Sequence, residues 1–60
     1  MTDEIRDAIL LVRDTGRTNM FDILAVQRIA YEMDLYELVL WLTDKENRSA
    51  YARFILTGAR

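Results

Sequence analysis

The segment from Phe21 to Met33 constrains the fold more than any other, because as a helix it is apolar on two sides. At helical spacing, one side carries Ile23, Val26, Ile29, Ala30 and Met33. The other side carries Phe21, Leu24 and Tyr31, with Arg28 and Glu32 between the two sides. A helix that covers one core needs only one apolar stripe. We therefore expect the second stripe to contact another copy of the chain or another protein.

Chain length limits how much of this apolar surface a single copy can hide. The sixty residues form one helical domain, 1–60, and a domain of this size buries only about 60% of the surface that its unfolded chain exposes. Small domains usually add disulfides, a metal ion or a partner subunit. The chain has no Cys and no His, although 52% of its residues are hydrophobic. Of these supports we therefore expect a partner subunit, and the chain to be a homodimer.

Capping signals predict an all-α fold, a compact bundle of three to four short helices. The first helix is expected from Asp3 to Asp14, with Thr2 as its N-cap and Gly16 as its left-handed stop. The second is expected to begin at Asn19, where Asp22 is placed three residues later to complete a capping box.

The third and fourth helices have similar start signals. Asp34 with Glu37 is expected to open the third helix, and Thr43 with Glu46 the fourth, which Gly58 ends. The run LVLWL, residues 38–42, is apolar all round and is expected to be buried on every side. A strand over residues 36–43 is the alternative, since aromatic and β-branched residues are present, but the run lacks the alternation of a half-buried strand.

Composition argues against several classes of function. The net charge of −2 does not suit a nucleic-acid binder, which needs a basic surface. No Cys or His is present as a nucleophile or base, and the carboxylate pairs lie at helix N-termini, where capping explains them. The first residues are charged and no long apolar run follows, so neither a signal peptide nor a membrane span is expected. We expect a cytoplasmic, non-enzymatic protein without a metal or cofactor.

Aromatic and arginine side chains are the expected contact residues, because Trp, Tyr and Arg are enriched among interface hot spots. Each buried aromatic hides about 150–250 Å², which a core this small accommodates poorly. The residues expected at a partner or dimer interface are Trp41, Tyr31, Leu24, Phe21, Arg28 and Arg17.

The stretch QRIAYEMDLYELVLWL has the texture of a DNA-binding helix-turn-helix. Ala30 is small, Asp34 lies at the turn, and Leu35 and Leu40 are apolar in the second part. The recognition helix would be 36–43, but Glu37 in it would face phosphates unfavourably. We therefore expect an αα-corner used for packing, and keep a small DNA-binding regulator as the alternative function.

The stretches RDTGRTNMFD, VQRIAYEMDLYELVLWL and FILTG resemble a family of small proteins encoded by phages and prophages of Gram-positive bacteria, described as a domain of unknown function. The resemblance covers residues 9–58. Its signature consists of Thr18, Asn19, Met20, Asp22, Val26, Ile29, Ala30, Tyr36, Glu37, Leu38, Val39, Phe54, Ile55, Leu56 and Gly58. Similar sequences often carry Gly where this chain has Asp34, which puts a tight helix-turn-helix geometry in doubt.

This resemblance implies a phage setting and supplies no catalytic residue or cofactor. Small phage proteins without catalytic groups commonly act by binding. The leading hypothesis is therefore a homodimer that binds and inhibits a host protein, with a component of antiviral defence as the target class. A regulator of phage genes is the second hypothesis, and an assembly accessory that contacts only phage proteins is the third.

Overall fold

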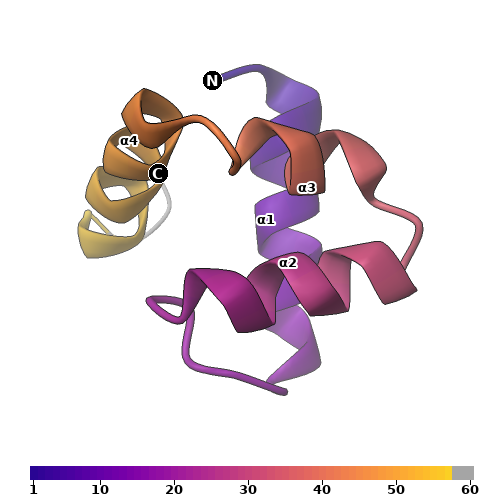
Figure 1. The fold of residues 1–60 in the computed structure, drawn as a ribbon. Helices are drawn as coiled ribbons and strands as arrows, with labels where there is room; N and C mark the ends of the chain where they lie inside the picture. The colour runs from indigo at the N-terminus through magenta and orange to yellow at the C-terminus, as the bar shows by residue number, and fades with distance from the viewer. Residues whose placement is uncertain (58–60) are drawn as a thin grey trace.

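The computed structural model describes residues 1–57, which contain four helices joined by turns (Figure 1). They are α1 (Asp3–Thr15), α2 (Ile23–Glu32), α3 (Tyr36–Trp41) and α4 (Lys45–Leu56). No strand occurs in residues 1–57, so the all-α prediction is confirmed and the strand alternative for residues 36–43 is wrong. None of these helices is both long and apolar enough to cross a membrane.

The first three helices form the core of the molecule, and α4 lies at its flank. In Figure 1, α1 runs through the centre, α2 crosses it near its C-terminal end, and α3 lies beside its N-terminal half. These three helices contact one another, whereas α4 stands to one side. The buried core consists of Ile5, Ala8, Ile9, Val12, Val26, Ile29, Ala30, Leu38, Leu42 and Tyr51.

Both ends of α1 are built from the residues that the sequence indicates. The Oγ1 atom of Thr2 accepts a hydrogen bond of 3.2 Å from the backbone N–H of Ile5. Gly16 has φ 64°, the left-handed conformation, and its N–H donates to the carbonyl of Arg13. A residue with a side chain would be strained at this φ, which explains why the helix ends at a glycine.

The predicted N-cap at Asn19 is wrong, because α2 begins three residues later with Asp22 as its cap. The Asp22 carboxylate accepts a hydrogen bond of 3.2 Å from the N–H of Ala25. Asn19 instead accepts from the N–H of Phe21 with its side chain, at 2.8 Å, and from the N–H of Asp22 with its carbonyl, at 2.9 Å. Asn19 therefore closes a turn that precedes the helix, a role that Asn fills as readily as a cap.

The predicted cap at Asp34 is also wrong. Leu35 is the N-cap of α3 and makes no side-chain capping bond. Asp34 has φ 64° and ends α2, with its N–H donating to the carbonyl of Tyr31 at 3.1 Å. Asp is one of the few residues other than Gly that tolerate this conformation. The turn between α2 and α3 is therefore tight despite the aspartate.

At α4 the cap is Asp44 rather than the predicted Thr43. The Asp44 carboxylate accepts from the N–H of Glu46 at 2.8 Å, while the hydroxyl of Thr43 donates to the carbonyl of Leu40 at 2.6 Å. Thr43 therefore binds the Leu40 carbonyl at the end of α3 with both its hydroxyl and its N–H, and the next residue caps α4. The predicted stop at Gly58 lies outside the described residues.

The prediction that residues 38–42 are buried on every side is wrong. Leu38 and Leu42, four residues apart, are fully buried, but Leu40 on the opposite side is 69% exposed. With only six residues, α3 lies on the surface of the core and covers it with one face. Leu40 therefore adds to the exposed apolar surface.

Tyr51 holds α4 against the rest of the protein. Its side chain is fully buried, and its hydroxyl donates to the carbonyl of Met20 at 2.5 Å. Asn47 makes a second link, from its side-chain amide to the carbonyl of Trp41 at 3.0 Å. Burial raises the pKa of Tyr51 to about 12. The position of α4 therefore depends on one buried tyrosine more than on an extended helix–helix contact.

Replacing Tyr51 tests this attachment. We expect Tyr51→Phe to lower the free energy of unfolding by about 1–2 kcal/mol, because the Met20 carbonyl loses its partner while the ring stays buried. Urea denaturation followed by circular dichroism measures this change. The matched control is Tyr31→Phe at an exposed tyrosine, with an expected change within about 0.5 kcal/mol. Equal effects of the two substitutions would contradict the assigned role.

The same two variants give a readout at alkaline pH. Above the ordinary tyrosine pKa of 10.0, the unfolded chain ionises while buried Tyr51 stays neutral up to about 12. The contribution of Tyr51 to stability is therefore complete below pH 10 and falls by roughly 1.4 kcal/mol per pH unit until its folded pKa is passed. Tyr51→Phe should remove this loss, and Tyr31→Phe should keep it.

The left-handed turn at Asp34 gives a second prediction. We expect Asp34→Gly to raise the free energy of unfolding by about 0.5–1 kcal/mol, since glycine adopts φ 64° without strain, and Asp34→Ala to lower it by about 1 kcal/mol. Thermal denaturation ranks the three proteins. Equal stability of the alanine and glycine variants would show that the left-handed backbone at position 34 does not determine which residue is stable there.

Candidate functional site

Eight large apolar side chains are exposed among the described residues. They are Met1, Leu11, Phe21, Leu24, Tyr31, Tyr36, Leu40 and Leu56. Single exposed apolar residues are normal on any protein, whereas contiguous groups of them mark interaction sites. The arrangement of these side chains on the surface is therefore the first guide to function.

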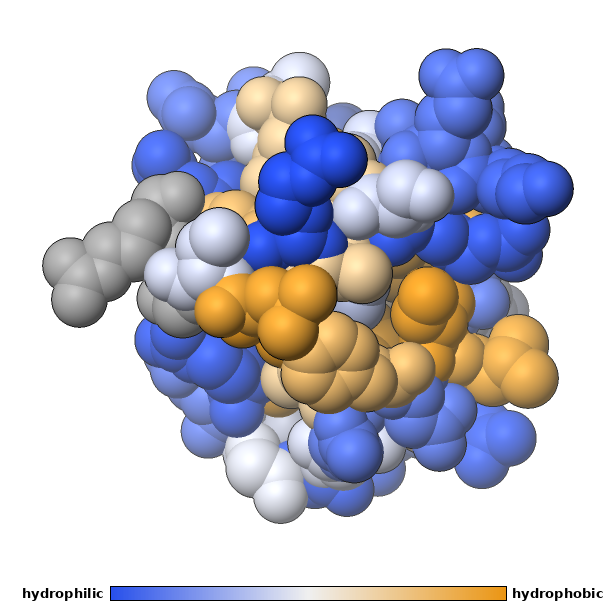
Figure 2. Space-filling view, turned by 90° about the vertical axis from the view of Figure 1, so that its left-hand side faces the viewer, coloured by the Kyte–Doolittle hydropathy of each residue, from blue (hydrophilic) through white to orange (hydrophobic). Residues whose placement is uncertain are grey.

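Three of these side chains lie on the turn before α2, on α2 and on α4, and a hydrogen bond links the turn to α4. Phe21 belongs to that turn, Leu24 to the first turn of α2 and Leu56 to the end of α4, and Leu24 and Leu56 are 76% and 74% exposed. The bond from Tyr51 to Met20 holds these two elements together. On the side of the molecule that Figure 2 shows, hydrophobic side chains gather in a band with hydrophilic ones above and below. We name Phe21, Leu24 and Leu56 the apolar face.

Tyr31, at the other end of α2, contacts Tyr36 of α3 instead of the core. The two rings pack edge to face, with centroids 5.4 Å apart and planes at 65°. The Tyr36 hydroxyl donates to the Asp34 carboxylate at 2.7 Å, and this bond, with the negative charge of Asp34, raises the pKa of Tyr36. Both rings are exposed, so this pair offers a rigid aromatic surface to solvent.

The two predicted interface arginines have different surroundings. Arg17 donates to Glu32 at 3.1 Å and thereby links the segment after α1 to the C-terminal end of α2. Both side chains are exposed, and such pairs stabilise proteins by less than about 1 kcal/mol. Arg28 is exposed on α2 and makes no ion pair within residues 1–57.

Trp41 lies apart from the apolar face. Its ring is half-buried and packs against the core, next to a hollow of about 410 Å³ that Ile5 and Leu40 also line. The six predicted interface residues therefore do not form one surface. Phe21 and Leu24 share the apolar face, and the others lie farther along α2, near its ends or on α3.

Two exposed leucines, Leu40 and Leu56, were not expected at a contact surface. Helical spacing is the signal that could have found them. Leu40 lies opposite the pair Leu38 and Leu42, and Leu56 falls outside the stripe that contains Tyr51 and Phe54. In a helix that covers the core with one stripe, such positions face solvent.

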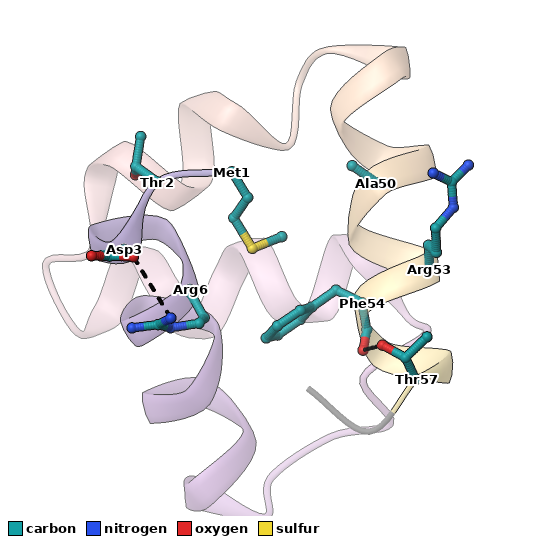
Figure 3. A pocket seen from close by; sticks show the side chains of 8 residues that line it. All are labelled: Met1, Thr2, Asp3, Arg6, Ala50, Arg53, Phe54 and Thr57. Carbon is teal, nitrogen blue, oxygen red and sulfur yellow. Dashed lines mark hydrogen bonds and ion pairs between the residues drawn. The ribbon is translucent and has the colours of Figure 1, made fainter. Parts of the chain in front are cut away.

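A cleft of about 400 Å³ separates the N-terminal end of α1 from α4 (Figure 3). The side chains of Met1 and Phe54 point into it from the two walls, whereas Arg53 points away. Arg6, on the α1 wall, lies 3.6 Å from Asp3 and 3.6 Å from Asp7, so its charge is already balanced. Within residues 1–57 no buried side-chain polar atom lacks a hydrogen-bond partner. The cleft is therefore an open, mainly apolar hollow without an unpaired group directed into it.

The geometry of α2 and α3 bears on the helix-turn-helix alternative. The two helices are joined by only three residues, with left-handed Asp34 in the middle, as a tight helix-turn-helix requires. However, α3 has six residues and its solvent side carries Tyr36, Glu37 and Leu40, without Lys or Arg. Residues 1–57 also contain no group of three or more His, Cys, Asp or Glu placed to hold a metal ion.

Comparison with known proteins places the chain in a family. No curated protein and no solved structure matches it significantly. A family model described as Domain of unknown function (DUF5049) matches residues 1–59, which is nearly the whole chain. The chain therefore belongs to this uncharacterised family, DUF5049.

Proposed function

We propose that the chain is a non-enzymatic phage or prophage protein that binds a host protein and inhibits it, with a component of antiviral defence as the target class. In this proposal it acts in the host cytoplasm as a homodimer. The observation that carries the proposal is the amount of large apolar side chain that this small protein exposes, together with the hydrophobic band of Figure 2, because exposed apolar patches are typical of protein-binding surfaces. The absence of Cys and His from the sequence supports binding over catalysis.

The size of the protein allows more than one contact. A standard protein interface covers about 800 Å² on each partner, which is roughly a fifth of the 4143 Å² surface described for this protein. Burial of apolar surface contributes about 25 cal/mol per Å², so a patch containing Leu24 and Leu56 supplies much of the free energy of association. A dimer contact and a target contact can therefore occupy different faces of one chain.

The exposed side of α2 suits pairing with a second copy. Leu24, Arg28 and Tyr31 follow one another along α2 at intervals of four and three residues, the spacing of a coiled-coil seam, and Phe21 lies in the turn just before the helix. In an antiparallel pair, Phe21 faces Tyr31 of the other copy, and Leu24 faces the aliphatic stem of Arg28, which packs while its charge stays in water. This arrangement covers three of the predicted interface residues with apolar partners.

The proposed dimer is tested by replacing Leu24. We expect the wild-type protein to sediment as a dimer at micromolar concentration and Leu24→Ser to sediment as a monomer with unchanged helicity, because Leu24 is exposed in the single copy. The matched control is Leu11→Ser at an exposed leucine of α1, which should stay dimeric. A wild-type monomer with full helicity would contradict the dimer.

The inhibitory function is tested in cells. We expect expression of the protein to raise the plating efficiency of a phage on a bacterial host that carries a restricting defence system, and to have no effect on a matched host without it. Leu24→Ser should lose this effect, whereas Leu11→Ser should keep it. No effect across a panel of defence systems, with no host protein retained on the purified chain, would overturn the proposal.

A DNA-binding regulator of phage genes is the second candidate, and the tight turn at Asp34 is the observation that favours it. In this function a dimer places α3 in the major groove, and exposed Arg28 and Arg48 contact phosphates. It requires a salt-dependent, sequence-selective gel shift that is lost in the double variant Arg28→Glu, Arg48→Glu. Absence of any shift at low salt removes this candidate.

A further inference from the structure

A second apolar groove, between α1 and α3, has a different character from the apolar face. It consists of two hollows of about 340 and 410 Å³ that share Glu4 and Glu37 in their walls. The apolar residues that line it are Ile5, Ala8, Leu35, Leu38, Leu40 and Trp41. The groove therefore combines an apolar lining with carboxylates, on elements that do not carry the apolar face.

The charges of this groove have one sign. Glu4, Asp34 and Glu37 line it, and no Lys or Arg does. Within residues 1–57 none of these three carboxylates makes an ion pair, whereas Asp3, Asp7, Asp14 and Glu32 each lie near an arginine. Glu4 and Glu37 lie in the first turns of α1 and α3, where the helix dipole favours acidic residues. The helix dipole accounts for the presence of carboxylates at these two positions. The charged side chains that border the apolar groove are nevertheless all negative.

We propose that this groove binds a basic amphipathic segment of a partner protein. Apolar side chains of the segment pack against Leu40 and Trp41, and its arginine or lysine side chains pair with Glu4 and Glu37. Arginine suits the site best, because its planar guanidinium pairs with a carboxylate through two hydrogen bonds and also stacks on aromatic rings. Tyr36 and Trp41 offer such rings in the two hollows.

A second copy of the chain fits this groove less well. The exposed cations Lys45, Arg48 and Arg53 lie on α4, where a basic helix face is available. However, α4 exposes only one large apolar side chain beside these cations, Leu56 at its C-terminal end, because Tyr51 is buried in its own chain. The chemistry of the groove therefore favours a segment with both large apolar and basic residues.

The inference rests on the proposed function only in taking a protein as the partner. It does not depend on the dimer, because the groove lies between α1 and α3 and the apolar face lies on the turn before α2, on α2 and on α4. Each surface can be disabled by its own substitution.

Trp41 makes the groove directly observable, since it is the single tryptophan of the chain and lines one hollow. The probe is a synthetic helical peptide without tryptophan that has leucine on one face and arginine on its flanks. The matched peptide has glutamate in place of arginine. We expect the arginine peptide to cause a saturable change in Trp41 fluorescence that weakens as salt is added, and the glutamate peptide to cause none.

Substitutions locate the binding site. Glu4→Gln and Glu37→Gln should each weaken binding of the arginine peptide about three- to tenfold, because each removes one partly exposed ion pair. Glu46→Gln, the same change at an exposed position of α4 outside the groove, should bind like the wild type. Leu24→Ser should also bind like the wild type, which separates this result from any failure of the dimer.

Three outcomes would overturn the proposal. The first is equal response to the two peptides, or no response to either. The second is loss of binding in Leu24→Ser with no change in the two glutamate variants, which would move the peptide to the apolar face. The third is self-association of the wild-type chain that Glu37→Gln abolishes in sedimentation, which would make a second copy the occupant.

Discussion

The buried ring of Tyr51 and the hydrogen bond from its hydroxyl to the carbonyl of Met20 anchor α4, together with half-buried Phe54 and Ile55, and the outer surfaces of the protein depend on that position. Helices α1, α2 and α3 share one core, but α4 adds only Tyr51 to its fully buried residues. The same bond brings the turn that carries Phe21 beside the helix that carries Leu56. It also leaves the cleft between α1 and α4 open, because the one buried tyrosine holds the helix without closing its whole length against α1. One residue thus connects the packing of the fold with the surface that the protein offers to others.

Short helices explain why so much apolar surface remains outside. The longest helix has 13 residues and α3 has six, so each contributes only a few positions to a core of ten residues. Any apolar residue off that single stripe has no other helix to cover it. A longer chain would add a helix there, whereas this one leaves Leu24, Leu40 and Leu56 exposed. The proposed association with a second copy or with a partner protein would bury such residues.

Much of the fold could be predicted from local signals, because the number of helices, the ends of α1 and the core stripes follow from caps and spacing. The caps at Asn19, Asp34 and Thr43 could not, since Asp22 and Asp44 are equally suitable caps for α2 and α4 and Asp34 is used in the turn before α3. Only tertiary packing decides whether Asn19 caps the helix or closes the turn before it. An aspartate before a helix also indicates a cap, whereas Asp34 supplies the left-handed residue of a tight turn. The surface on which Trp41 lies could not be predicted for a similar reason, because composition shows that a ring is too large for the core but not which groove it lines.

The two candidate functions make opposite demands on α3. Its solvent side carries Glu37, which would repel the phosphates of DNA but attracts the arginines of a protein segment. Glu4 from α1 and Asp34 from the turn line the same groove, so the fold brings together carboxylates from three separate segments of the chain. A helix-turn-helix would also bury Leu40, whereas here that leucine is exposed and lines the groove beside Trp41. The features that make α3 a poor reader of DNA are therefore the ones that make it a suitable wall for binding a basic protein segment.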